Sequence, residues 1–189
     1  MSASLDLYWI PLGAGEKVVR LSGRLYESLC AFVQRRPRCE LYHSALVATT
    51  DTGRYSIEMT PIPKTAGDRG VVAEGVVGSR ILRRFRVYRY EVRCWRNGVI
   101  PDLPYAVASP VRVSDEAAVV QRVLDLLPQV PTLVWGRDEL HAGEMWNSNS
   151  VVSWVLTKAG VCTTDVHPPV RGRAPGWDAG LHAAAVVGR

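Results

Sequence analysis

The segment "CELYHSALVAT" and the "RYSIEM" that follows it constrain the fold more than any other part of the chain. Each run alternates between apolar and polar residues, as a strand with one buried face does. The turn "TDTG", Thr50 to Gly53, joins them, and Pro61 and Pro63 prevent further pairing after the second run. We therefore predict a β-hairpin. In its first strand, one face carries Leu41, His43, Ala45 and Val47, and the other carries Tyr42, Ser44 and Leu46.

Three segments have the apolar periodicity of amphipathic helices. The first is "GRLYESLCAFVQRR", which Ser22 can cap, and the second is "EAAVVQRVLDLL", which Ser114 opens. The third runs from about Ser148 to Ala159 and ends at Gly160, a residue typical of the position after a helix. The order of these elements favours an α+β fold, with a mostly antiparallel sheet packed against helices, over a βαβ alternation.

The other segments are predicted to be less regular. Residues 63–78 are rich in Gly and polar residues and are predicted to form a loop. A long strand is predicted from Leu82 to Trp95, whereas the Pro/Gly-rich tail from about residue 163 is predicted to wrap the surface as an irregular segment. A chain of 189 residues, 47% of them apolar, has the size of one domain, residues 1–189.

The composition argues against several classes of protein. No apolar run approaches the roughly 20 residues that span a bilayer, and the N-terminus has no basic leader, so we predict a cytoplasmic protein without a transmembrane segment. The four cysteines form no C-x-x-C pair, and His141 and Glu144 lack a second pair of ligands. Gly13 and Gly15 do not form a phosphate loop. We therefore expect neither a metal nor a cofactor.

The helix start "WNSNSVVSWVL" has two interpretations. In the first, Asn147, Ser148 and Asn149 only cap the helix, as small polar residues commonly do. In the second, Ser148 is a nucleophile. A helix N-terminus stabilises negative charge and a strand can hold an imidazole in place, so His43 would serve as the base. The residue pattern alone leaves both interpretations open.

The two motifs together resemble those of circularly permuted papain-fold, or NlpC/P60-like, proteins. "YHSALVATTDTGRYSIEMTP" is similar to the histidine strand, turn and second strand of that family, and "WNSNSVVSWVL" is similar to its helix start. The resemblance implies a papain-like α+β fold in which His43 is the base, Glu58 orients it, and Ser148 occupies the position of the family's nucleophilic cysteine. It also implies a hydrolase or acyltransferase that acts on a small molecule or on an acyl or peptide substrate.

The serine at position 148 changes the chemistry that this resemblance implies. A cysteine thiol ionises near pKa 8.5, so a helix terminus and an imidazolium can make it a thiolate. A helix terminus contributes about 0.3–1 kcal/mol, which leaves a serine hydroxyl protonated. Ser148 would react only if His43 lay within hydrogen-bond reach and removed its proton. We therefore predict that any activity of a Ser148–His43–Glu58 site is weak or lost.

A second class of function rests on the segment "RILRRFRVYRYEVRCWR", Arg80 to Arg96, which holds much of the net charge of +5. Arginines interleaved with aromatic residues can bind phosphates, although charges on an edge strand also prevent aggregation. The alternative to an enzyme is a non-catalytic binding or scaffold protein that contacts an anionic partner. The arginines predicted to bind the anion are Arg84, Arg86, Arg89 and Arg93.

Overall fold

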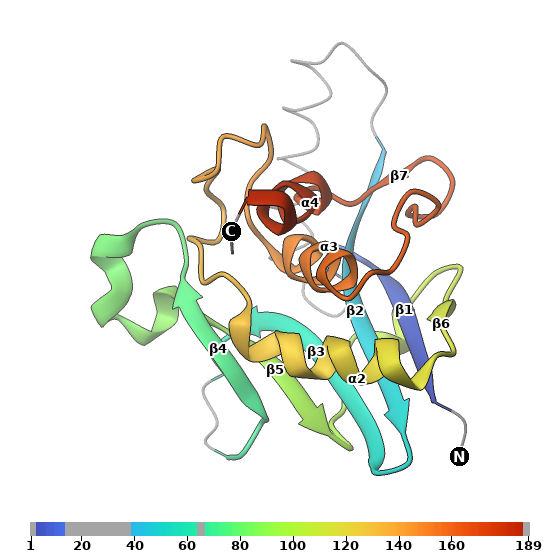
Figure 1. Cartoon of the computed structure of the whole chain (residues 1–189). Coiled ribbons are helices and arrows are strands. Elements are labelled where there is room, and N and C mark those ends of the chain that lie inside the picture. Colours follow the sequence, from blue (N-terminus) through green and yellow to red (C-terminus); the bar gives the residue numbers. More distant parts are fainter. Residues whose placement is uncertain (1–2, 14–38, 64–66, 187–189) are drawn as a thin grey trace.

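The computed structural model describes residues 3–13, 39–63 and 67–186 (Figure 1). The helix predicted to follow Ser22 lies outside these residues. Within them, the chain forms an α+β fold in which a mostly antiparallel sheet packs against helices. The predicted fold class is confirmed at this level.

The sheet contains the predicted hairpin near its centre. Six strands follow the order β4-β5-β3-β2-β1-β6, and every neighbouring pair in this order is antiparallel. Leu46 lies opposite Ile57 in the hairpin, which is therefore confirmed. A short seventh strand, β7, pairs in parallel with the start of β2. The strands of the described ranges are β1 (Ser4–Pro11), β2 (Glu40–Thr50), β3 (Gly53–Pro61), β4 (Val71–Val76), β5 (Arg89–Arg96), β6 (Val111–Ser114) and β7 (Gly172–Arg173).

The helices of the described residues lie on one face of the sheet (Figure 1). None of them is both long enough and apolar enough to cross a bilayer. The α-helices are α2 (Ala117–Leu126), α3 (Ser148–Lys158) and α4 (Trp177–Val186). The 3-10 turns are η1 (Arg80–Arg84), η2 (Arg86–Tyr88), η3 (Leu103–Tyr105) and η4 (Leu127–Gln129).

The two faces of the sheet are covered differently. On the helix face, Leu46 of β2 and Val155 of α3 belong to the main hydrophobic core. The second face carries a smaller cluster built around Ile10, Ala45 and Ile100. Successive side chains of a strand point to opposite faces, so even-numbered residues of β2 face the helices and odd-numbered ones face away. This alternation decides where the predicted site residues point.

The predicted second and third helices are confirmed, with a change at the start of the second. Ser114 ends strand β6, which was not predicted, and α2 begins only at Ala117. The Ser114 hydroxyl accepts a hydrogen bond from the backbone N–H of Glu116 at 3.1 Å, so it still supports the helix start. Helix α3 begins at Ser148, and Gly160 follows it with a φ of 84°, the left-handed conformation that glycine favours.

The predictions for residues 63–95 need two corrections. Strand β4 forms inside the predicted loop, and its Gly75 allows a close approach, because a Cβ there would lie 2.2 Å from the Tyr90 ring. The predicted long strand begins only at Arg89, because β3 and β4 end opposite Tyr90 and Arg89. Residues 80–88 form η1 and η2 instead, and Figure 1 shows them extending away from the sheet at the left. We call residues 80–88 the arginine projection.

The prediction of an irregular tail from about residue 163 is wrong from Trp177 onward. The Pro/Gly-rich stretch ends at Gly176, and helix α4 follows it directly. Small residues let α4 pack closely on α3: a Cβ at Gly180 would lie 2.0 Å from the Ser153 Oγ. The buried residues of α4 are Ala179, Gly180, Ala183 and Ala184. The tail therefore contributes to the core, and it brings its own backbone against the start of α3.

Candidate functional site

The start of α3 is a complete helix cap. The Asn147 side-chain oxygen accepts a hydrogen bond from the backbone N–H of Asn149 at 2.8 Å. The Ser150 hydroxyl accepts one from the backbone N–H of Asn147 at 3.0 Å, which completes a capping box. Such bonds satisfy N–H groups that lack partners in the first turn of a helix. The cap interpretation is confirmed for Asn147.

Asn149 joins three parts of the chain. Its amide nitrogen donates to the backbone oxygens of Tyr42 at 2.9 Å and Pro175 at 2.8 Å. Its amide oxygen accepts a hydrogen bond from the Ser44 hydroxyl at 2.8 Å. The residue is almost fully buried, so these bonds are shielded from water. One side chain thus ties α3 to strand β2 and to the segment that precedes α4.

Neighbouring side chains bind the same segment, residues 175–177. The Asn147 amide donates to the Pro175 oxygen at 2.8 Å, and the Ser150 hydroxyl donates to the Gly176 oxygen at 2.7 Å. The hydroxyl of Ser153, one turn further along α3, donates to the Trp177 oxygen at 2.7 Å. The polar groups at the start of α3 are therefore occupied by the protein's own backbone. The segment that occupies them was predicted to be an irregular tail.

Ser148 has no such role. Its side chain is nearly buried, with 6% of the residue exposed, and among the described residues its hydroxyl has no hydrogen-bond partner. A nucleophilic serine needs a base about 2.6–3.2 Å from its oxygen. Within the described part of the chain, the structure provides Ser148 with neither a base nor a cap function.

His43 lies on the other face of β2. It pairs with Ile10 of β1, and both Ile10 and Ala45 belong to the second-face cluster. Its neighbour Ser44 points the opposite way and bonds to Asn149 of α3. The structure therefore does not assemble the predicted His43–Ser148 pair, because strand alternation directs His43 away from α3. The predicted face of His43, shared with apolar residues, is confirmed.

Burial in this cluster has an electrostatic consequence for His43. It lowers the pKa of the imidazole to about 4, because the charged form loses its water. The side chain is therefore neutral at pH 7. A neutral imidazole could accept a proton in principle, but a base with so low a pKa is poorly matched to catalysis at neutral pH.

Glu58 has a different partner from the one predicted. Its carboxylate forms an ion pair with the Arg93 guanidinium at 2.9 Å. Arg93 also contacts Glu91 at 2.5 Å, and Glu91 accepts a hydrogen bond from Arg69 at 2.8 Å. Burial raises the pKa of Glu58, and Arg93 opposes that shift. In this structure Glu58 therefore belongs to a carboxylate–guanidinium network and does not orient His43.

The burial of His43 makes stability depend on pH. Between pH 7 and pH 5 the unfolded chain takes up a proton at His43 and the folded chain does not, so acid favours unfolding. Wild-type protein should lose about 2 kcal/mol of its free energy of unfolding through this group. Denaturant titrations of wild type and His43→Leu at both pH values measure the effect. The control variant His182→Leu changes an exposed histidine and should show the same decrease in the free energy of unfolding between pH 7 and pH 5 as wild type. A decrease of similar size in His43→Leu would contradict the assignment to His43.

The four arginines predicted to bind an anion divide into two pairs. Arg93 is buried in the network with Glu58 and Glu91, and Arg89 forms an ion pair with Glu74. For these two the structure corrects the prediction, because their charges already have carboxylate partners. Arg84 and Arg86 lie exposed in the arginine projection, and Arg83 beside them is also exposed.

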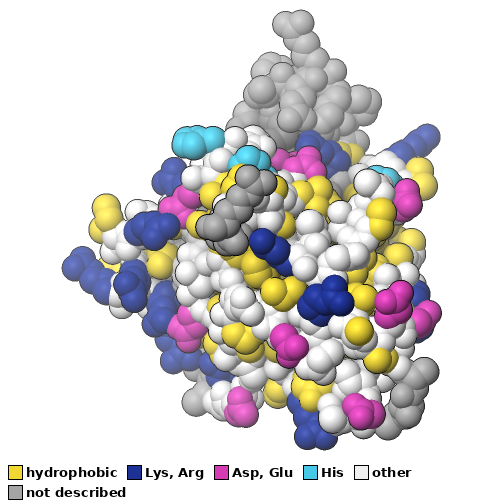
Figure 2. All heavy atoms as spheres, viewed as in Figure 1, with side chains coloured by type: hydrophobic (Ala, Val, Ile, Leu, Met, Phe, Trp, Pro, Cys, Tyr) yellow, Lys and Arg dark blue, Asp and Glu magenta, His cyan; other side chains and the backbone are white. Residues whose placement is uncertain are grey.

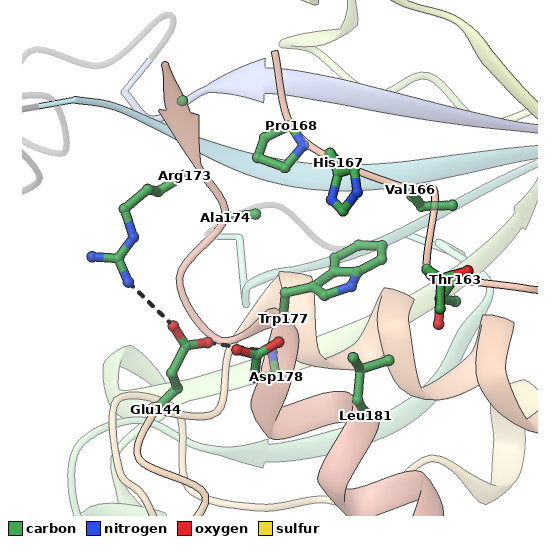
Figure 3. Close-up of a pocket in the computed structure, with 12 residues that line it drawn as sticks. Glu144, Thr163, Val166, His167, Pro168, Arg173, Ala174, Trp177, Asp178 and Leu181 are labelled. Atoms are coloured by element: carbon green, nitrogen blue, oxygen red, sulfur yellow. Dashed lines mark hydrogen bonds and ion pairs between the residues drawn. The ribbon is translucent and has the colours of Figure 1, made fainter. Parts of the chain in front are cut away.

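A pocket of about 350 Å³ lies beside α4 (Figure 3). The Glu144 carboxylate lies 3.6 Å from the Arg173 guanidinium and accepts hydrogen bonds from the backbone N–H groups of Gly176 and Asp178. Burial raises the pKa of Glu144, and these bonds oppose the shift. The sequence did not predict this pocket, because most of its lining comes from the supposed tail. Further lining residues include Thr163, Val166, His167, Trp177 and Leu181.

The pocket does not form a metal centre. In the described ranges, no group of three or more His, Cys, Asp or Glu side chains is placed to hold a metal ion. Glu144 is already used by two backbone N–H groups and by Arg173, so it supports the segment that precedes α4. The pocket is therefore a hollow with a mixed polar and apolar lining, in which Trp177 contacts the Trp9 ring at 5.2 Å between centroids.

Comparison with known proteins adds no assignment to this geometry. No family model matches the chain, and no curated protein or solved structure matches it either. The NlpC/P60-like resemblance therefore stays an expectation based on two motifs. Function has to be argued from the arrangement of the residues themselves.

Proposed function

We propose that this chain is a non-catalytic binding protein in which the start of α3 is structural and the arginine projection contacts an anionic partner. The non-catalytic part of this proposal rests on the orientation of His43, which points away from the face that holds Ser148. A serine without a base in hydrogen-bond reach keeps its proton and does not attack an acyl carbon. The described residues therefore do not form the serine–base pair that a Ser–His–Glu hydrolase requires.

The hydrogen bonds at the start of α3 also support a structural role. A hydrolase needs free N–H groups that can stabilise an oxyanion. Here the backbone N–H groups of Asn147 and Asn149 are bonded to side chains of the cap. The amide of Asn149 is bonded to the backbone of β2 and of the segment before α4. These groups hold the fold together and are not available to a substrate.

We further propose that the fold is papain-like and of the permuted NlpC/P60-like type. The contact between the start of α3 and strand β2, through Asn149 and Ser44, supports this proposal. So does the order of the chain, in which strand β2 precedes helix α3, although His43 points away from that helix. In this view Ser148 marks a lost active site, and the helix start was retained because it anchors the C-terminal segment.

The proposed absence of catalysis is tested with a serine-reactive phosphonate. We expect no covalent adduct on the intact protein and no turnover of generic esters or amides above that of Ser148→Ala. Intact-mass spectrometry and initial rates measure the two effects. An adduct located at Ser148, together with turnover lost in both Ser148→Ala and His43→Ala, would instead establish a serine hydrolase.

The binding half rests on the exposed arginines of the projection. Phosphate or sulfate contacts release counterions, so affinity for a polyanion should fall steeply with salt. We expect wild-type protein to be retained on a heparin column and Arg84→Gln/Arg86→Gln to elute at clearly lower salt. Arg54→Gln/Arg171→Gln removes the same charge from two exposed positions outside the projection. Equal elution of both double variants would show that only net charge matters and would refute an anion site at the projection.

A further inference from the structure

The arginine projection is held firmly at its base. The backbone N–H of Val77 donates to the Tyr88 oxygen at 2.8 Å, and that of Gly78 donates to the Trp135 oxygen at 2.9 Å. Arg80 forms a two-point contact with Glu139, at 2.9 and 3.0 Å. These bonds fix the direction in which residues 81–87 extend from the sheet.

The projection exposes apolar side chains that the core does not use. Ile81 is 83% exposed and Val87 is 78% exposed, and Phe85 and Tyr88 are also exposed. Neither η1 nor η2 contains a buried residue. Single exposed apolar residues are common in proteins, but a group of them on one projecting segment indicates a contact surface.

Positive charge surrounds these apolar side chains. The sequence contains no acidic residue between Glu74 and Glu91, while the projection itself contains Arg80, Arg83, Arg84 and Arg86. Arg80 is paired with Glu139, but no carboxylate among the described residues pairs with Arg83, Arg84 or Arg86. Figure 2 shows Lys and Arg side chains gathered at the left of the molecule, where the projection lies, beside hydrophobic side chains.

We propose that the arginine projection binds the surface of an anionic lipid membrane. Ile81, Phe85 and Val87 enter the boundary between headgroups and acyl chains, and Arg83, Arg84 and Arg86 contact lipid phosphates. An apolar group flanked by arginines matches such an interface, where apolar burial and attraction to anionic lipid act together. This inference rests on the proposed function and names the class of its anionic partner.

The side chains favour lipid over nucleic acid. Proteins that bind single strands stack bases on aromatic rings, whereas the two most exposed apolar residues here, Ile81 and Val87, are aliphatic and cannot stack. The Phe85 ring carries the Arg84 guanidinium over its face, 4.8 Å from the centroid, and meets Tyr88 edge-on. Aliphatic side chains gain most from an apolar medium, which a membrane provides and a phosphate backbone does not.

The test is flotation of the full chain with vesicles. One set is phosphatidylcholine alone, and the other contains equal parts of phosphatidylcholine and phosphatidylserine. We expect binding to the anionic set, at least about tenfold weaker binding to the neutral set, and weaker binding as salt increases. Ile81→Ser/Val87→Ser keeps every charge and should reduce binding several-fold, and Arg84→Gln/Arg86→Gln should reduce it about tenfold or more.

Two controls make the result decisive. Val170→Ser removes an apolar side chain that is 95% exposed outside the projection, and Arg54→Gln/Arg171→Gln removes two charges elsewhere, so both should bind like wild type. Binding to a single-stranded oligonucleotide without binding to vesicles would refute the lipid inference but leave the proposed anionic contact intact. Binding to neither, with no retention on heparin, would refute both. Unchanged vesicle binding by Ile81→Ser/Val87→Ser would refute insertion of the apolar side chains.

Discussion

Replacing Asn149 with alanine should lower the free energy of unfolding by about 3–4 kcal/mol, because a buried side chain with three hydrogen-bond partners is lost. The Ser44 hydroxyl and the backbone oxygens of Tyr42 and Pro175 would lose their bonds to Asn149. The Ser44 hydroxyl and the Tyr42 oxygen would then carry a desolvation cost, whereas the Pro175 oxygen keeps its bond to Asn147. The segment before α4 would lose one of its contacts with α3. Urea or guanidinium titrations followed by circular dichroism measure the change.

Ser148→Ala is the matched control for this prediction. It lies one residue earlier in the same helical turn, is also nearly buried, and changes a hydroxyl that has no hydrogen-bond partner among the described residues. We expect a change within about 0.5 kcal/mol, as for substitutions that remove no specific interaction. If Ser148→Ala were as destabilising as Asn149→Ala, the assignment of the structural role to Asn149 would be wrong.

Local signals in the sequence predicted the elements whose partners are close in the chain. The β2–β3 hairpin needs only two alternating runs and a turn, and all three lie within residues 40–61. Helix α3 carries its own cap and stop signal, at Asn147 and Gly160. In these cases the local preference and the tertiary structure agree, so sequence reasoning was sufficient.

The elements that sequence reasoning missed depend on distant partners. The alternation of arginine with apolar residues from Arg80 onward suggested a strand, but a strand needs neighbours. Strand β3 ends opposite Tyr90, and β4 ends opposite Arg89. Helix α4 is short and follows a Pro/Gly-rich stretch, and its small residues matter only because α3 lies against them. Composition could not reveal either relationship.

The candidate site illustrates the same limit. The alternation of β2 correctly predicted that His43 shares a face with apolar residues, and the motif correctly located the start of α3. Neither pattern says on which face of the sheet α3 packs. Because α3 packs on the face of Ser44, the contact between strand and helix runs through Ser44 and Asn149. Had His43 stood one position further along β2, it would face α3 in place of Ser44. The alternation of side chains along the strand therefore decides whether the contact is catalytic or structural.

Glu91→Gln should have an effect at least as large as that of Asn149→Ala, about 3–5 kcal/mol at pH 7, because it breaks a buried charge network. Glu91 is completely buried and accepts hydrogen bonds from Arg69 at 2.8 Å and Arg93 at 2.5 Å. Without this carboxylate, Glu58 is the one anionic partner that the buried Arg93 retains among the residues that the structure describes. Chemical denaturation at pH 7 measures the loss.

The pH dependence separates the contribution of charge from that of side-chain shape in this network. Burial alone would raise the pKa of Glu91, but hydrogen bonds from Arg69 and Arg93 outweigh it and hold that pKa below its usual range. The unfolded chain therefore binds the proton first, and the stability that Glu91 provides is complete above its unfolded pKa and declines as the pH falls below about 4. The difference in the free energy of unfolding between wild type and Glu91→Gln should therefore become smaller below about pH 4. A difference that stays constant down to pH 3 would mean that packing, and not charge, is what Glu91 supplies.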